Sequence, residues 1–236
     1  MVDPNSIRHY FSVYEGAFLE AFHRLGFDEP GGNHAPSPFL GINKCLGQLV
    51  QDDIIADKPV LVLGSGDSRI NVALNYHGRD SYGLERDLTT HKMGLLTVKA
   101  LRGGGLIRPE RPIVLSPGDF YEPSSYEGLG LPFEVFHTVY HYDGTGDFHH
   151  MEGVAHLVAH ESRPGTVLLL AAHNGIPFHF EGLSCNRTYR IWGRPNAVAG
   201  MYLHVYKKTM TMQERGLRRK RAHHDAFAVT GPAHRT

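Results

Sequence analysis

A tight turn with the chemistry of a ligand-binding loop follows an apolar run. Residues 60–63 are all apolar. The five residues after them are Gly64, Ser65, Gly66, Asp67 and Ser68. Glycine lets the backbone bend sharply and lets a ligand approach without meeting a Cβ atom. A helix is expected to begin near Ser68, and its first turn offers free N–H groups and a partial positive charge. The pattern indicates a nucleotide-binding loop.

A carboxylate at a matching position supports this interpretation. Glu85 lies 21 residues after Gly64, at the end of a second predicted strand, Ser81–Leu84. A carboxylate there can accept hydrogen bonds from both hydroxyls of a ribose. A Gly-Ser-Gly turn alone is a weak signal, because every α/β protein needs tight turns after its strands. Together, the turn and Glu85 favour a nucleotide site.

Alternating strands and helices must position these residues. Short apolar runs predict strands at Pro59–Leu63, Ser81–Leu84, Pro112–Leu115, Phe133–Val139 and Gly165–Ala171. Apolar residues at helical spacing predict helices at Ser68–Tyr76, Asp87–Arg102 and His150–Ser162. Such alternation is typical of βαβ units with right-handed crossovers, and therefore of a parallel sheet.

The two ends of the chain differ from this pattern. Two helices, Ser6–Leu25 and Phe39–Ile55, precede the first strand, and residues 1–57 are expected to form a helical cap. The last two strands, Thr188–Trp192 and Tyr202–Lys207, have no clear helix between them, which favours an antiparallel pair. Residues 58–210 would form the sheet domain. Residues 211–236 would form a basic, mobile tail.

From Lys58 to Lys207 the chain resembles the class I S-adenosylmethionine (SAM) dependent methyltransferases. The resemblance is carried by the Gly64–Ser68 turn, Glu85, the stretch from Ile113 to Phe120, and the Arg-Pro-Gly turn at 163–165. It implies an α/β fold with a seven-stranded, mostly parallel Rossmann-like sheet, an antiparallel C-terminal strand pair and N-terminal helices. It also implies SAM as the cofactor.

The resemblance also assigns roles to individual residues. The expected cofactor-binding residues are Gly64, Ser65, Gly66, Asp67, Ser68, Glu85, Arg86, Asp119, Phe120 and His137. Glu85 would bind the ribose, and Asp119 would contact the adenine amine with Phe120 beside the ring. The residues expected after the fourth strand, on the acceptor side, are Tyr140, His141 and Tyr142. His141 is the candidate base, and no metal site is predicted.

Two departures keep alternatives open. Val62 stands where the family often has an acidic residue, and Ser68 stands where it usually has a third glycine. A methyltransferase-like protein that binds without turnover is therefore a second hypothesis. An NAD(P)-dependent enzyme is a third, although Arg69 occupies the position where the dinucleotide fingerprint needs glycine.

The composition limits which classes of partner we expect the protein to bind. The chain has 236 residues, and 24 basic residues balance 24 acidic ones. A nucleic-acid acceptor is disfavoured because such proteins usually carry a basic excess, although Arg215–Arg221 holds five basic residues in seven. With no apolar run long enough for a membrane span, a cytoplasmic enzyme is expected. The predicted acceptor is a small molecule or a peptide-like group. The N-terminal helices would cover the active site or form a homodimer contact.

Overall fold

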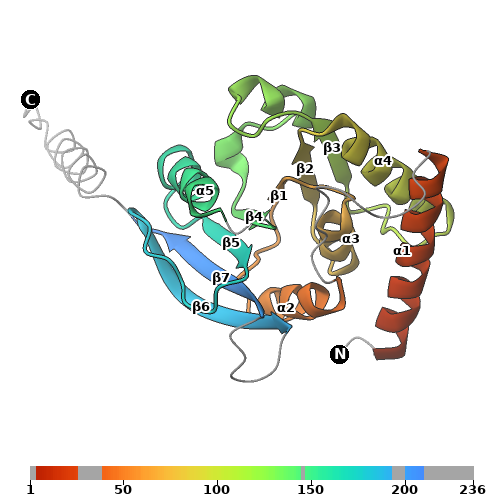
Figure 1. The fold of residues 1–236 in the computed structure, drawn as a ribbon, viewed down its shortest axis with the longest axis horizontal. Coiled ribbons are helices and arrows are strands. Elements are labelled where there is room, and N and C mark those ends of the chain that lie inside the picture. The colour runs from red at the N-terminus through yellow and green to blue at the C-terminus, as the bar shows by residue number, and fades with distance from the viewer. Residues whose placement is uncertain (1–3, 26–38, 145–146, 193–199, 210–236) are drawn as a thin grey trace, which may run out of the picture.

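The fold is one sheet with helices on both faces (Figure 1). The computed structural model describes residues 4–25, 39–144, 147–192 and 200–209. The α-helices in these ranges are α1 (Pro4–Arg24), α2 (Phe39–Gln51), α3 (Arg69–Tyr76), α4 (Leu88–Gly103) and α5 (Phe148–Glu161). The strands are β1 (Val60–Leu63), β2 (Ser81–Glu85), β3 (Ile113–Pro117), β4 (Thr138–Tyr142), β5 (Val167–Ala172), β6 (Leu183–Trp192) and β7 (Met201–Lys208). None of the described helices is long and apolar enough to cross a membrane.

The strand order predicts where a ligand would bind. The order is β3-β2-β1-β4-β5-β7-β6. Strands β1 to β5 are parallel, and β7 runs antiparallel to both β5 and β6. The predicted seven-stranded, mostly parallel sheet with N-terminal helices is therefore confirmed. Because the chain leaves β1 in one direction and returns on its other side at β4, a ligand crevice is expected where their carboxyl ends separate.

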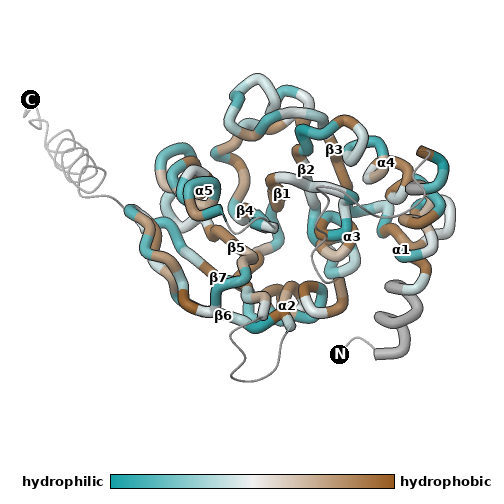
Figure 2. The backbone as a smooth tube through the Cα atoms, viewed as in Figure 1, coloured by the Kyte–Doolittle hydropathy of each residue, from teal (hydrophilic) through white to brown (hydrophobic). Residues whose placement is uncertain are grey.

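Alternate residues of the strands build two cores. Val60 and Val62 point into the cluster beneath α1 to α4, which also holds Ile42 and Leu46. Leu61 and its neighbours on that side pack under α5 and two 3-10 helices, η1 (Pro123–Leu129) and η2 (Phe133–Val135). Figure 2 shows the apolar residues, in brown, running along the central strands. A strand buried on both faces explains the continuous apolar runs in the sequence.

One strand begins later than predicted. The sequence predicts a strand at Phe133–Val139, whereas β4 spans Thr138–Tyr142. Residues 133–135 instead form η2, directly after Pro132. The sequence offers no glycine or proline between 133 and 142 to mark the true start, so periodicity alone could not fix it. Tyr140, His141 and Tyr142 are consequently part of the strand rather than the loop after it.

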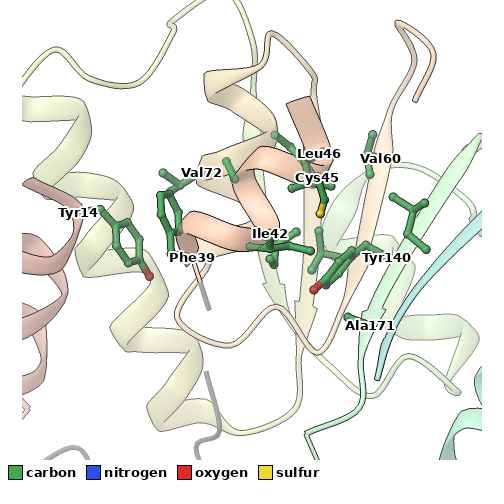
Figure 3. Close-up of a cluster of buried hydrophobic side chains, with 14 of the residues drawn as sticks. Tyr14, Phe39, Ile42, Cys45, Leu46, Val60, Val72, Tyr140 and Ala171 are labelled. Carbon is green, nitrogen blue, oxygen red and sulfur yellow. The ribbon is translucent and has the colours of Figure 1, made fainter. Parts of the chain in front are cut away.

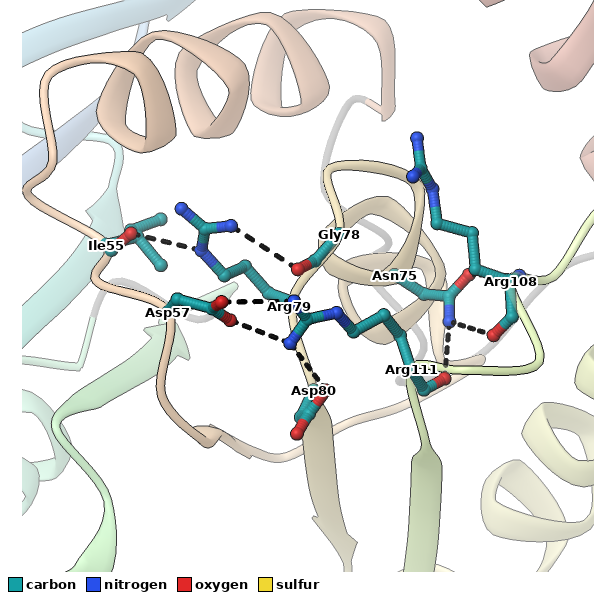
Figure 4. Close-up of polar contacts among 8 residues, drawn as sticks. All are labelled: Ile55, Asp57, Asn75, Gly78, Arg79, Asp80, Arg108 and Arg111. Atoms are coloured by element: carbon teal, nitrogen blue, oxygen red, sulfur yellow. Dashed lines mark hydrogen bonds and ion pairs between the residues drawn. The ribbon is translucent and has the colours of Figure 1, made fainter.

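A buried amide fastens the amino edge of the sheet (Figure 4). Asn75 of α3 is fully buried, and its Nδ2 donates to the carbonyls of Arg108 (3.2 Å) and Arg111 (2.7 Å). Its Oδ1 accepts from the backbone N–H of Arg108 at 2.9 Å. The Arg111 guanidinium also pairs with Asp57 at 2.7 Å and Asp80 at 3.3 Å. The segment between α4 and β3 is thereby tied to α3.

We expect Asn75→Ala to lower the free energy of unfolding by about 2–4 kcal/mol, because three backbone groups lose their partner at once. Asn71, one turn earlier on α3, is the matched control. It is equally buried, and its amide has no hydrogen-bond partner among the described residues. Asn71→Ala should cost less than about 1 kcal/mol. Urea unfolding of both variants measures this, and equal losses would contradict the role given to Asn75.

Candidate functional site

The turn after β1 has the conformation that its composition predicts. Gly64 and Gly66 have φ angles of 67° and 56°, in the left-handed region that glycine tolerates best. Ser68 also lies there, with φ 67°, although it carries a Cβ atom. The bend that a third glycine would give is therefore preserved by serine. Ser68 N donates to the carbonyl of Ser65 at 2.8 Å, which closes the turn.

The Glu85 carboxylate holds this turn in place. Gly66 N–H donates to Glu85 Oε2, and Asp87 N–H donates to Oε1, both at 2.9 Å. Ser65 N–H also donates to the carbonyl of Leu84 at 2.8 Å. An ionised carboxylate offers about four acceptor positions, and these contacts use two. Glu85 is half-buried, so its other positions can accept hydrogen bonds from a diol.

Helix α4 packs against the turn. Gly94 lies so close that a Cβ atom there would overlap Ser68 Oγ and come within 3.0 Å of the Gly66 carbonyl. Ser65 packs in the same way on Gly83 of β2, where a Cβ atom would come within 2.7 Å of Ser65 Cβ. Both serine side chains are thus directed into the protein. The loop offers a ligand its backbone rather than its hydroxyls.

Asp67 is committed to a buried ion pair. Its carboxylate accepts from Arg69 Nε at 3.0 and 2.9 Å, and both side chains are almost fully buried. The guanidinium lies 5.8 Å from the ring centre of Tyr14 and 5.9 Å from that of Phe18, both on α1. Burial, and next the nearby Asp67, raise the pKa of Tyr14. Asp67 therefore contributes its backbone to the loop, while its side chain anchors α1.

Two other predicted residues, Arg86 and Asp119, lie at the same ends of the strands. The backbone N–H of Gly118 donates to the carbonyl of Glu85 at 3.0 Å, which brings the end of β3 beside the end of β2. Asp119 Oδ2 lies 3.5 Å from Arg86 Nη1, and its Oδ1 accepts from Tyr121 N–H at 3.0 Å. An exocyclic amine would find a carboxylate acceptor at this point.

His141 faces this group from the end of β4. Its Nδ1–H donates to the carbonyl of Leu63 at 3.1 Å, since a carbonyl can only accept. The ring centre lies 5.0 Å from that of His150 and 5.8 Å from that of Phe120. His141 is 3% exposed, and its Nε2 has no hydrogen-bond partner among the described residues. Sequence reasoning left His150 outside the site, because its place on α5 carries no motif.

Burial changes what His141 can do. Burial is the largest of the effects that together lower the pKa of His141 to about 4, so the ring is neutral at pH 7. A ring with so low a pKa is a weak proton acceptor. Its Nε2 lone pair is covered by the surrounding protein in this structure. The expectation of a general base at His141 is revised accordingly.

Two predicted residues lie away from the crevice. Tyr140 is 1% exposed and packs in the core beneath α2, near Ile42 and Ala171 (Figure 3). His137 directly precedes β4, whose first residue Thr138 pairs with Val60 at the start of β1. His137 therefore lies at the amino ends of the parallel strands, whereas the turn lies at their carboxyl ends. Both assignments are corrected, and both errors follow from placing β4 too early.

Two other side chains, those of Tyr142 and His173, lie at the carboxyl ends of the strands. Tyr142 ends β4, and its hydroxyl lies 3.4 Å from Nε2 of His173, which follows β5. Burial, followed by the neighbouring Asp143, raises the pKa of Tyr142. The sequence predicts a role for Tyr142, and it also gives His173, directly after the fifth predicted strand, as a candidate for the rim of the site. Their contact depends on the adjacency of β4 and β5 in the sheet.

The close contact at Gly94 gives one prediction. Gly94→Ala should lower the free energy of unfolding by about 1–3 kcal/mol, because the added methyl group overpacks the turn. Gly16, on α1, has nothing within 4 Å of an added Cβ atom. Gly16→Ala should therefore raise the free energy of unfolding by about 0.5–1 kcal/mol through helix propensity. Urea titration checks both signs, and a stabilising Gly94→Ala would refute the contact.

The low pKa of His141 gives a second prediction. Below pH 6.5 the unfolded chain binds a proton that the folded protein binds only near pH 4, so folding stability falls as the pH drops through this window. Between pH 7 and 4.5, His141 should account for a loss of about 2–3 kcal/mol in the free energy of unfolding. His141→Asn keeps an N–H donor for Leu63 but does not titrate, so its stability should fall less between pH 7 and 4.5. An equal fall in the wild type and in His141→Asn would contradict this role of the buried ring.

The chain is similar to known proteins in its structure. No protein-family model matches the chain, and no curated protein matches its sequence. An RNA methyltransferase from Salinibacter ruber, in complex with S-adenosyl-L-homocysteine, is 18% identical, with a TM-score of 0.54 over 75% of this chain and 96% of its own. The CcbJ methyltransferase from Streptomyces caelestis is 14% identical, with a TM-score of 0.56 over 84% and 98%.

A further match carries the cofactor itself. A variant of MtNAS in complex with S-adenosylmethionine is 11% identical, with a TM-score of 0.51 over 86% of this chain and 76% of its own. At such identities the similarity concerns the fold. This chain has the Rossmann-like fold of the class I SAM-dependent methyltransferases.

Proposed function

We propose that this protein is a SAM-dependent methyltransferase acting on a small-molecule or peptide-like acceptor. The observation that carries the proposal is the Glu85 carboxylate, which holds the Gly66 N–H and keeps acceptor positions open at the crevice between β1 and β4. The methyltransferase fold of the matched structures supports the same function.

The residues at the crevice fit an adenosyl cofactor. Glu85 would accept from the ribose hydroxyls, and the backbone of the Gly64–Ser68 turn would approach the ligand without side chains in the way. Asp119 and Phe120 would hold the adenine, with Arg86 beside them. When bound, SAM supplies an activated methyl group.

We place the acceptor at the ends of β4 and β5. Methyl transfer needs the two reactants aligned, and it needs a base only if the acceptor atom must lose a proton. The Tyr142 hydroxyl would orient the acceptor, and His173 Nε2, 3.4 Å away, would take the proton. This pair replaces Tyr140 and His141 in the catalytic role that the sequence first suggests.

The balance of charge favours a small acceptor over a nucleic acid. One matched structure is an RNA methyltransferase. This chain, however, has no net charge at pH 7. Affinity for nucleic acid comes largely from basic groups that neutralise phosphates. A small or peptide-like acceptor does not require such an excess.

Calorimetric titration with SAM, S-adenosylhomocysteine and NAD tests the cofactor. We expect the first two ligands to bind and NAD to give no heat of binding. Tritium transfer from labelled SAM to a mixture of cell metabolites then tests turnover. Binding of SAM without transfer to any acceptor would support the non-catalytic alternative, and binding of NAD alone would refute the proposal.

The ribose contact gives a sharper prediction. Glu85→Ala should weaken the binding of S-adenosylhomocysteine by about 1–3 kcal/mol, because hydrogen bonds to a charged acceptor are lost. Glu85 also holds the turn, so the loss alone does not identify the contact. The 2′,3′-dideoxy analogue of the ligand completes a double-mutant cycle. The wild type should discriminate against this analogue, and Glu85→Ala should not. Equal discrimination by both proteins would place the ribose elsewhere.

A further inference from the structure

A hollow lies on the face of the sheet that α5 covers. It encloses about 540 Å³ between α5 and the helices η1 and η2. Much of its lining is apolar or aromatic, and includes Tyr126, Leu131, Phe133 and Leu157. Tyr126 and Phe133 meet edge to face with ring centres 5.5 Å apart. We call this hollow the η groove. Its volume is in the range of ligand-binding pockets.

The charge of the η groove has one sign. Three of its twelve lining residues are glutamates, Glu127, Glu134 and Glu161, and no lysine, arginine or histidine is among the twelve. All three glutamates are exposed. Aromatic faces attract cations, and arginine stacks on them while its charge meets carboxylates. The lining therefore favours a ligand that combines apolar groups with several positive charges.

The described chain ends beside this groove. β7 ends at Lys208, whose side-chain Nζ donates to the carbonyl of Ser162. Ser162 directly follows Glu161, the groove residue at the end of α5. The backbone of Lys208 is fixed there as well, because its N–H donates to Thr166 at 2.8 Å and its carbonyl accepts from Gly165 at 3.1 Å.

The sequence beyond β7 has the complementary charge. Five of the seven residues from Arg215 to Arg221 are basic, and Leu217 adds an apolar side chain. Five residues lie between Thr209 and Arg215, so the two are six residue steps apart, and six extended steps span about 20 Å. The run lies outside the described residues, and the chain leads to it from Lys208, which contacts the residue next to Glu161.

We propose that the η groove binds the basic run Arg215–Arg221 of the same chain. The guanidinium groups pair with the three glutamates and stack on the aromatic lining, and Leu217 contacts its apolar part. Phe120 and Tyr121 line the groove and directly follow Asp119. The bound run therefore lies against the segment proposed to hold the adenine. The docking itself does not depend on the proposed function.

Carbodiimide cross-linking of the full chain tests the proposal. This reagent joins a carboxylate to a lysine amine that it touches, and Lys220 is the one lysine in the run. Mass spectrometry should find Lys220 linked to Glu127, Glu134 or Glu161. About 0.5 M salt leaves the carboxylates in place and should reduce these links in the wild type by roughly five- to twentyfold, the combined effect of three exposed ion pairs. Glu→Gln at all three positions removes the carboxylates that the reagent activates, so it must abolish these links, and its effect on docking is measured by protease cleavage.

A matched variant separates this site from general charge. Glu110, Glu152 and Glu181 are exposed and do not line the groove. Glu→Gln at these three positions should leave the links unchanged. Trypsin gives a second measurement: it should cut within 215–221 faster in the groove variant than in the wild type.

Three results would overturn the proposal. The first is Lys220 linked mainly to other carboxylates or to none. The second is equal trypsin cleavage in the wild type and the groove variant. The third is a linked product of twice the chain mass that grows with protein concentration, which would assign the groove to a second copy.

Discussion

The candidate site depends on one interaction, the hydrogen bond from Gly66 N–H to the Glu85 carboxylate. It joins the turn after β1 to the end of β2, and Gly118 N–H joins the end of β3 to the same residue through its carbonyl. Three strand ends therefore meet around one residue, through its side chain and its backbone carbonyl. A half-buried carboxylate can hold this arrangement because backbone N–H groups satisfy part of its charge, and its remaining lone pairs stay available.

The surroundings of the turn show how its conformation is maintained. Ser68 adopts a left-handed φ that costs free energy for any residue with a Cβ atom. The contact with Gly94 behind it and the Asp67–Arg69 pair beside it hold the segment there. Since Arg69 also packs under Tyr14 and Phe18, α1 contributes to the shape of the site. This contact gives the N-terminal helix a structural role.

Sequence patterns predicted the fold well because strands buried on both faces are apolar throughout and turns are marked by glycine. They also placed Gly66, Glu85 and Asp119 at one edge, since parallel strands end together. The errors come from β4, where no residue marks the start, so Tyr140 and His137 were misassigned. Contacts between distant segments, such as Tyr142 with His173 or His141 with His150, depend on strand order and packing, which local periodicity does not encode.

The place of β7 in the sheet has a consequence for synthesis of the protein. It is the last strand of the described chain, yet it lies between β5 and β6. During translation the earlier strands emerge first, and β5 then presents an unpaired edge. Within the described chain, β6 has no partner except β7. The described sheet can be completed only after residue 208 leaves the ribosome, so the nascent chain exposes the open, apolar edge of β5 until then.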